Sequence, residues 1–126
     1  MSIPEEWTDD MSVDIKFGKT NRELAASLLF ALDQRQSYEE MMSICSQDFG
    51  LTEDDGDLAI DRVQGGVVRA ITCNSVNCPE KSKDPLAWYS FQSVWKTLPR
   101  KNWWSLKKDN QGKWLKWYNE RTDNDS

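Results

Sequence analysis

The spacing of apolar residues predicts an amphipathic helix near the start of the chain. Leucines recur every four residues between positions 24 and 32, which places them on one face of a helix. Thr20 and Glu23 have the spacing of a capping box, in which each side chain satisfies a free backbone N–H at the helix start. The pattern therefore predicts a helix over residues 21–35 with its leucines in the core.

A second helix is predicted over residues 38–48. Ser37 repeats the capping signal with Glu40 three residues later, and Gly50 stands where a left-handed residue would end the helix. Cys45 belongs to the apolar stripe of this helix and is expected to be a small core residue. The stripe is formed by Met41, Ile44, Cys45 and Phe49.

The pattern over residues 57–72 is ambiguous. Its apolar positions suit a short helix or a strand, and Gly65-Gly66 interrupts them. We favour a helix that ends before the glycines and leave the topology of 57–84 open. The two glycines lack the Lys-Ser/Thr pair of a phosphate loop and the glycine spacing of a dinucleotide site.

A third helix is predicted over residues 85–98. Asp84-Pro85 is a typical start, with an N-cap acceptor followed by proline at the first helical position, and Pro99 ends the helix. One face is apolar and aromatic. The opposite face, with the residues that follow the helix, is polar and then basic: Gln92, Ser93, Lys96, Thr97, Arg100 and Lys101.

Residues 103–118 are predicted to form a β-hairpin. Apolar and polar residues alternate on both sides of Asp109–Gly112, which are turn residues. We expect a single domain over 20–118 and a disordered tail over 119–126. Residues 1–19 form a partly ordered acidic arm, which we expect to be held against the core by Trp7, Val13, Ile15 and Phe17.

The order of these elements predicts a winged helix-turn-helix. Helices followed by a C-terminal hairpin give an α+β, mostly helical fold, in which the last core helix faces the DNA major groove and the hairpin is the wing. In such a fold, helix 85–98 would contact DNA and the hairpin 103–118 would contact its backbone or minor groove.

Three segments resemble the N-terminal winged-helix domain of Mrr-type restriction proteins. Phe49–Asp55 is similar to the turn after its second helix, Phe91–Leu98 to its recognition helix, and Lys113–Thr122 to its second wing strand. The chain departs from that pattern by extra length between Asp55 and Pro85 and lacks a nuclease domain. The resemblance implies DNA contacts by Gln92, Ser93, Lys96 and Thr97, and phosphate contacts by Arg100 and Lys101.

Composition excludes several classes of chemistry. The chain has no histidine, so His-based acid–base catalysis and histidine-ligated metals are absent. Its acidic pairs occur at capping or turn positions, where helix-end electrostatics explains them. Three cysteines without a second ligand pair cannot complete a zinc site. We therefore expect no enzyme, no metal, no cofactor and no small-molecule substrate.

Charge and tryptophan are unevenly distributed. Residues 1–78 carry six Lys or Arg and fifteen Asp or Glu, whereas residues 79–126 carry ten and six. Six of the seven tryptophans lie between 88 and 117. Half of these should be core, namely Trp95, Trp104 and Trp117. The exposed half would stack on bases or anchor a protein partner, namely Trp88, Trp103 and Trp114. The lysines that lie between them in the sequence would bind phosphate, namely Lys107, Lys108, Lys113 and Lys116.

Two functions follow. The first is a nucleic-acid-binding regulator that binds DNA, duplex rather than single-stranded, through helix 85–98 and the basic hairpin. The alternative is a small acidic inhibitor or adaptor, of a phage or mobile-element type, that binds a nucleic-acid-binding protein. No apolar run is long enough to span a membrane and no secretory signal is visible, so we expect a cytoplasmic protein with reduced cysteines.

Overall fold

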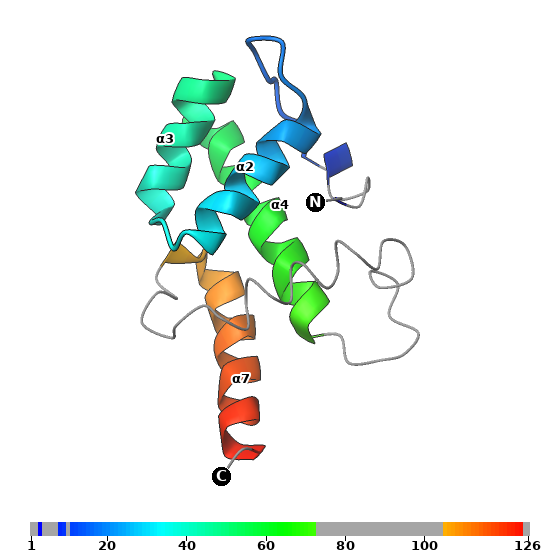
Figure 1. Ribbon diagram of the computed structural model, residues 1–126, viewed down its shortest axis with the longest axis vertical. Coiled ribbons are helices and arrows are strands. Elements are labelled where there is room, and N and C mark those ends of the chain that lie inside the picture. The colour runs from blue at the N-terminus through cyan, green and yellow to red at the C-terminus, as the bar shows by residue number, and fades with distance from the viewer. Residues whose placement is uncertain (1–2, 4–7, 10, 73–104, 125–126) are drawn as a thin grey trace.

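A computed structural model of the chain describes residues 3, 8–9, 11–72 and 105–124. This part contains the helices α2 (Asn21–Asp33), α3 (Tyr38–Phe49), α4 (Glu53–Thr72) and α7 (Lys108–Asn124). Helix α4 is central, because α2, α3 and α7 all pack against it, while α2 also packs against α3 (Figure 1). No strand occurs among the described residues. The predicted α+β winged helix-turn-helix is therefore wrong.

The first two predicted helices are confirmed. The Thr20 hydroxyl accepts a hydrogen bond from the Glu23 N–H, and the Glu23 carboxylate accepts one from the Thr20 N–H at 2.7 Å, which completes the capping box of α2. Ser37 caps α3 by accepting from the Glu40 N–H at 3.1 Å. Gly50 ends α3 with φ 69°, a left-handed conformation that suits glycine.

Helix α4 continues through Gly65-Gly66, contrary to the prediction that it ends before them. Its buried residues keep helical spacing across the glycines, with Ala59, Val63 and Val67 each four residues apart. A glycine in a helix costs about 1 kcal/mol relative to alanine. Burying one valine side chain contributes about 1.5–3 kcal/mol. Packing of this apolar face therefore outweighs the two glycines.

The predicted hairpin over 103–118 is also wrong, because residues 108–124 form α7. Leu106, Asn110 and Trp114 are buried, and each lies one helical turn from the next. The turn residues Asp109–Gly112 form the start of the helix rather than a loop. The segment that resembles a second wing strand lies within α7, which also extends past residue 119 into the predicted tail.

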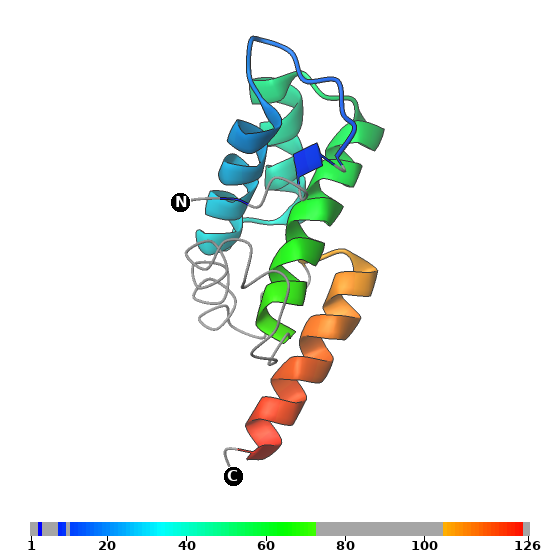
Figure 2. The same cartoon turned by 90° about the vertical axis from the view of Figure 1, so that its right-hand side faces the viewer.

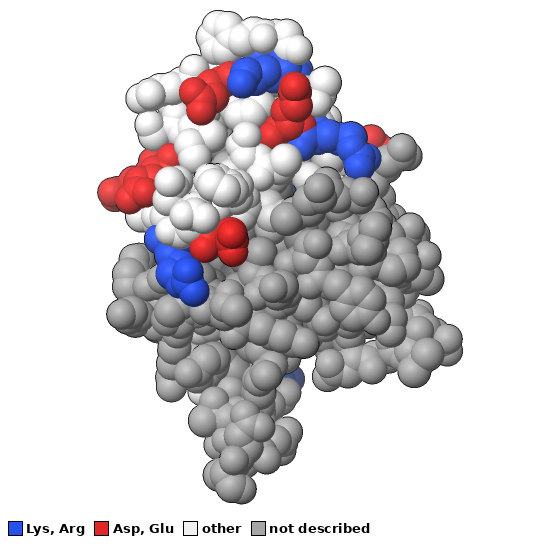
Figure 3. All heavy atoms as spheres, viewed as in Figure 1, with Lys and Arg blue, Asp and Glu red and all other residues white. Residues whose placement is uncertain are grey.

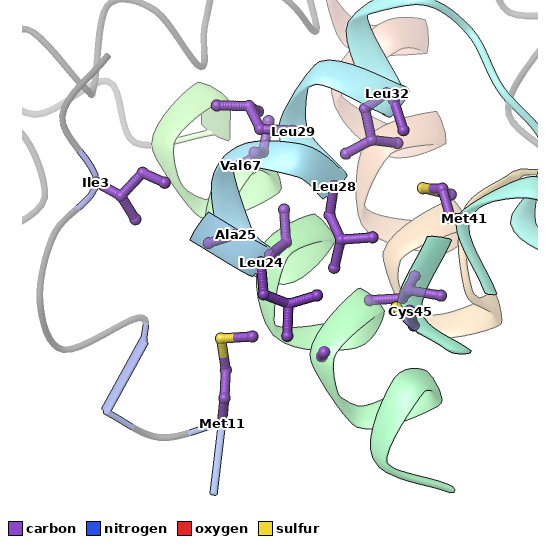
Figure 4. Close-up of a cluster of buried hydrophobic side chains, with 14 of the residues drawn as sticks. Ile3, Met11, Leu24, Ala25, Leu28, Leu29, Leu32, Met41, Cys45 and Val67 are labelled. Carbon is purple, nitrogen blue, oxygen red and sulfur yellow. The ribbon is translucent and has the colours of Figure 1, made fainter. Parts of the chain in front are cut away.

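The core lies between α4 and the helices on either side of it. Figure 4 shows leucines of α2 directed at α4, with Met41 and Cys45 of α3 beside them. Cys45 is buried, as predicted. The same cluster includes Leu24, Leu28, Leu29 and Leu32 from α2 and Phe49 from α3.

The N-terminal arm contacts the core through some of the predicted residues and through others that were not predicted, and Trp7 lies outside the described residues. Met11 and Ile3 are buried beside α2, as Figure 4 shows. Val13 and Ile15 pack against the core, as expected, but Phe17 is 69% exposed. The described part of the arm is therefore held to the bundle mainly by methionine and isoleucine.

Helix α7 lies at one side of the bundle. It runs beside the second half of α4, and its C-terminal end extends beyond the other helices (Figure 2). None of the described helices is both long and apolar enough to cross a membrane. The predicted helix 85–98 lies outside the described residues.

Candidate functional site

A buried glutamine joins α4 to the start of α7. The Gln64 side chain is fully buried, and its Nε2 donates to the Ser105 carbonyl at 2.9 Å. Its Oε1 accepts from the Lys107 N–H, also at 2.9 Å. One amide thus satisfies a donor and an acceptor of the backbone just before α7. These bonds fix where α7 begins relative to α4.

Lys107 is part of an ion-pair network between helices. Its Nζ lies 2.8 Å from Asp57 Oδ2 and 3.9 Å from Asp61 Oδ1. The Tyr38 hydroxyl on α3 donates to the other oxygen of Asp57. The hydrogen bond from Lys107, with that from Tyr38, holds the pKa of Asp57 below its usual value. Burial, followed by the nearby carboxylate, raises the pKa of Tyr38.

These contacts change the predicted phosphate-binding set. Lys107 is half-buried, and its Nζ lies within 4 Å of two carboxylates. Its charge is therefore already used within the chain and is not free to bind phosphate. Trp114 is fully buried, and the prediction that it is exposed for stacking is wrong. The remaining lysines of α7 are exposed and make no ion pair within the described part: Lys108, Lys113 and Lys116.

Most other predicted contact residues cannot be placed. Residues 73–104 lie outside the described part of the chain, and this range includes both other tryptophans proposed as contacts. The predicted residues in this range are Trp88, Gln92, Ser93, Lys96, Thr97, Arg100, Lys101 and Trp103.

The strongest charge feature of the described residues is acidic. Residues 36–61 contain eight Asp or Glu and no Lys or Arg. Asp57 and Asp61 face Lys107. The other six are exposed or half-buried on two helices that pack against each other. We call these six the acidic surface, with Glu39 and Glu40 at the first turn of α3 and the other four at its opposite end: Asp48 of α3, and Glu53, Asp54 and Asp55 at the start of α4.

A groove lies between α2 and α3. It has a volume of about 420 Å³ and is open to solvent beside Phe30, which is 64% exposed. The groove was not predicted from the sequence. Phe30 lies outside the leucine stripe of α2, and an aromatic residue at such a position is the signal in the sequence that could have indicated an exposed apolar site. The lining residues are Ala26, Ser27, Phe30, Gln36, Ile44 and Asp48.

A second, smaller pocket of about 150 Å³ lies between α4 and α7. It is lined by Gly65, Gly66 and side chains of both charges, including Asp61 and Lys113. Its charged lining residues are three basic ones, Arg62, Arg69 and Lys113, and two acidic ones, Asp61 and Asp109.

Groups able to perform chemistry are scarce in the described residues. No three His, Cys, Asp or Glu side chains there are placed to hold a metal ion. Burial raises the pKa of the Cys45 thiol to about 12, so this buried thiol stays protonated at neutral pH and is a poor nucleophile.

Comparison with known proteins provides no relative from which a role could be transferred. No family model matches the chain, and neither a curated protein nor a solved structure matches it.

Proposed function

We propose that this chain is a non-enzymatic interaction module whose acidic surface binds a basic surface of a partner protein. The observation that carries this proposal is the stretch 36–61, where eight carboxylates occur without one Lys or Arg. Within the described residues, two of them, Asp57 and Asp61, share the single positive charge of Lys107. The other six leave α3 and the start of α4 with an unbalanced negative charge.

Helix capping explains part of this charge but not all of it. Glu39, Glu40 and the acidic residues of α4 lie in first turns, where the helix dipole favours negative charge. Asp48 lies in the last turn of α3, where the dipole opposes it, and that turn contains no basic residue, although Lys19 of the N-terminal arm lies over the Phe49 ring at 5.0 Å. Helix capping therefore does not account for Asp48.

A basic surface is what a nucleic-acid-binding protein presents to phosphate. An acidic protein can occupy such a surface by imitating its charge, and complementary charge also accelerates association. The partner we propose is therefore a nucleic-acid-binding protein, and the chain acts as its inhibitor or adaptor.

The test is selection of a displayed random-peptide library on the immobilised chain. The wild type should enrich peptides rich in Lys and Arg, and enrichment should weaken as salt rises. Neutralising the acidic surface in E39Q/E40Q/D48N and in E53Q/D54N should remove these peptides. The matched control, K108Q/K113Q/K116Q, should retain them. Equal enrichment by the carboxylate variants would contradict the proposal.

A second candidate is nucleic-acid binding by α7. The observation that favours it is the trio of exposed lysines, Lys108, Lys113 and Lys116, which lack ion pairs within the described residues. Titration with random duplex and single-stranded DNA at two salt concentrations, followed by tryptophan fluorescence, tests it. Three phosphate contacts predict a slope of about −3 in log K against log salt for duplex DNA. Absence of binding at low salt would exclude this candidate.

A further inference from the structure

The α2–α3 groove exposes an aromatic side chain that has no role in the core. Phe30 points away from the leucine stripe and is 64% exposed, among the largest apolar exposures in the described part of the chain. Ile44 of α3 packs against the core and also lines the groove. Together they provide an apolar surface that a single inserted side chain could cover.

The groove follows the helices for about one turn on each side. Ala26 and Phe30 are four residues apart on α2, and Ile44 and Asp48 are four residues apart on α3. The segment between the helices is short, and the two helices pack against each other. Figure 3 shows uncharged surface on this side of the molecule with charged side chains along parts of its margin. A groove of this shape suits an amphipathic helix that inserts apolar anchors at helical spacing.

The two edges of the groove differ in charge. On α3, Glu40 lies one turn before Ile44 and Asp48 lies one turn after it, and both are exposed. No ion pair engages either of them within the described residues. The α2 edge is mixed, because Arg22 lies one turn before Ala26 and Asp33 lies one turn after Phe30. The α3 edge therefore favours cations on whatever occupies the groove.

We propose that the α2–α3 groove binds a basic amphipathic helix of the partner protein. An apolar side chain of that helix packs between Phe30 and Ile44, and its Lys or Arg residues face Glu40 and Asp48. This inference rests on the proposed function and specifies which part of the basic partner the chain contacts. A second copy of the chain is less favourable: a two-fold axis across the groove would bring two acidic α3 edges together, and an axis along the groove would set each α3 edge against the mixed α2 edge, whereas a basic helix places cations along the whole α3 edge.

The experiment uses the full chain and two synthetic helical peptides of equal charge. The first contains Lys with Leu spaced three and four residues apart, and in the second each Leu is replaced by Gln. The Leu–Lys peptide should shift the backbone amide resonances of Ala26, Phe30 and Ile44. Its affinity should fall at least about tenfold for F30S, a loss of about 1.4 kcal/mol, and should fall for E40Q/D48N. The Gln–Lys peptide should bind more weakly.

The matched control is F17S, which removes an aromatic side chain as exposed as Phe30 but outside the groove. It should leave the affinity of the Leu–Lys peptide unchanged. Because Phe30 and Phe17 are both exposed, neither substitution should unfold the chain, and circular dichroism verifies this.

The outcomes separate the two proposals. If both peptides bind equally and F30S has no effect while E40Q/D48N weakens binding, the groove inference is wrong. The proposed function, binding of a basic partner by the acidic surface, is then still supported. If neither peptide binds, or if the carboxylate variants bind as well as the wild type, the proposed function is wrong. Sedimentation that shows Phe30-dependent dimers would identify a second copy as the occupant and overturn the groove inference.

Discussion

Lys107 Nζ lies 2.8 Å from Asp57 Oδ2, although the two residues are fifty positions apart in the chain. This ion pair joins the segment before α7 to α4, and the Tyr38 hydroxyl extends it to α3. Each partner is partly exposed, so solvent screening limits its contribution to stability. Its clearest consequence is therefore a dependence of stability on pH.

The pKa of Asp57 is lower in the folded state than its usual value, chiefly because Lys107 donates to the carboxylate. A lowered folded pKa contributes stability above the unfolded pKa, about 3.9 for Asp, and this contribution is lost as pH falls through the folded pKa. Wild type should therefore lose more of its free energy of unfolding than D57N between neutral pH and about pH 2. Urea unfolding at a series of pH values measures this difference.

The variant K107M tests the cause of the same pH dependence. It removes the principal donor to Asp57 and should also lessen the loss of stability in acid. In the double variant D57N/K107M the effects should not add, because both substitutions remove one interaction. Additive effects, or an acid dependence in D57N equal to that of wild type, would show that this pair does not contribute.

The Gln64 amide should be essential to the junction between α4 and α7. Q64L would leave the Ser105 carbonyl and the Lys107 N–H without their present partner. A buried polar group left unsatisfied costs about 1–3 kcal/mol, so Q64L should lower the free energy of unfolding by at least about 2 kcal/mol. The control is Q47L on exposed α3 surface, which should change it by less than about 0.5 kcal/mol. Similar losses in both variants would contradict this role.

The first two helices could be predicted from sequence because their signals are local. The start of α2 is marked by Thr20 and Glu23, and the two ends of α3 are marked by Ser37 and Gly50. These capping residues lie within a few positions of the apolar residues that the helices bury. Burial of Cys45 follows from the same spacing. Where capping residues and apolar spacing agree, no information from distant parts of the chain is needed.

Helix α7 could not be predicted in this way, because a polar residue occupies the middle of its buried face. Asn110 is buried between Leu106 and Trp114, and its side chain donates to Asp61 of α4 at 3.5 Å. The apolar pattern of α7 is therefore interrupted at Asn110, whose polar side chain finds its partner in Asp61, a residue far away in the sequence. With that gap, period-two alternation around Asp109–Gly112 appeared to be the stronger signal. The same reasoning made Trp114 an exposed contact instead of a core residue.

Gly56 should be required for close packing of α4 on α3. A Cβ at this position would lie 2.6 Å from Met42 Sδ and 3.2 Å from Cys45 Cβ. The Met42 thioether is flexible and can move, whereas Cys45 Cβ is fixed to α3, so G56A should destabilise the chain by about 1 kcal/mol, the low end of the cost of an overpacked core, despite the higher helix propensity of alanine. Shortening the neighbour in G56A/M42A should recover part of the loss. Thermal unfolding monitored by circular dichroism measures both variants, and a G56A variant more stable than wild type would contradict the close approach.

Gly65 provides the opposite case and distinguishes a continuous α4 from one that ends before the glycines. A Cβ at this position would approach the described atoms no closer than 3.5 Å, to Asn110 Oδ1, which is ordinary contact. In a helix, replacing glycine with alanine should then raise the free energy of unfolding by about 0.5–1 kcal/mol. If the chain instead turned at Gly65-Gly66 with a positive φ, alanine would be strained there and G65A would be destabilising. The sign of the change in urea midpoint, at unchanged m-value, therefore decides whether α4 passes through these glycines in solution.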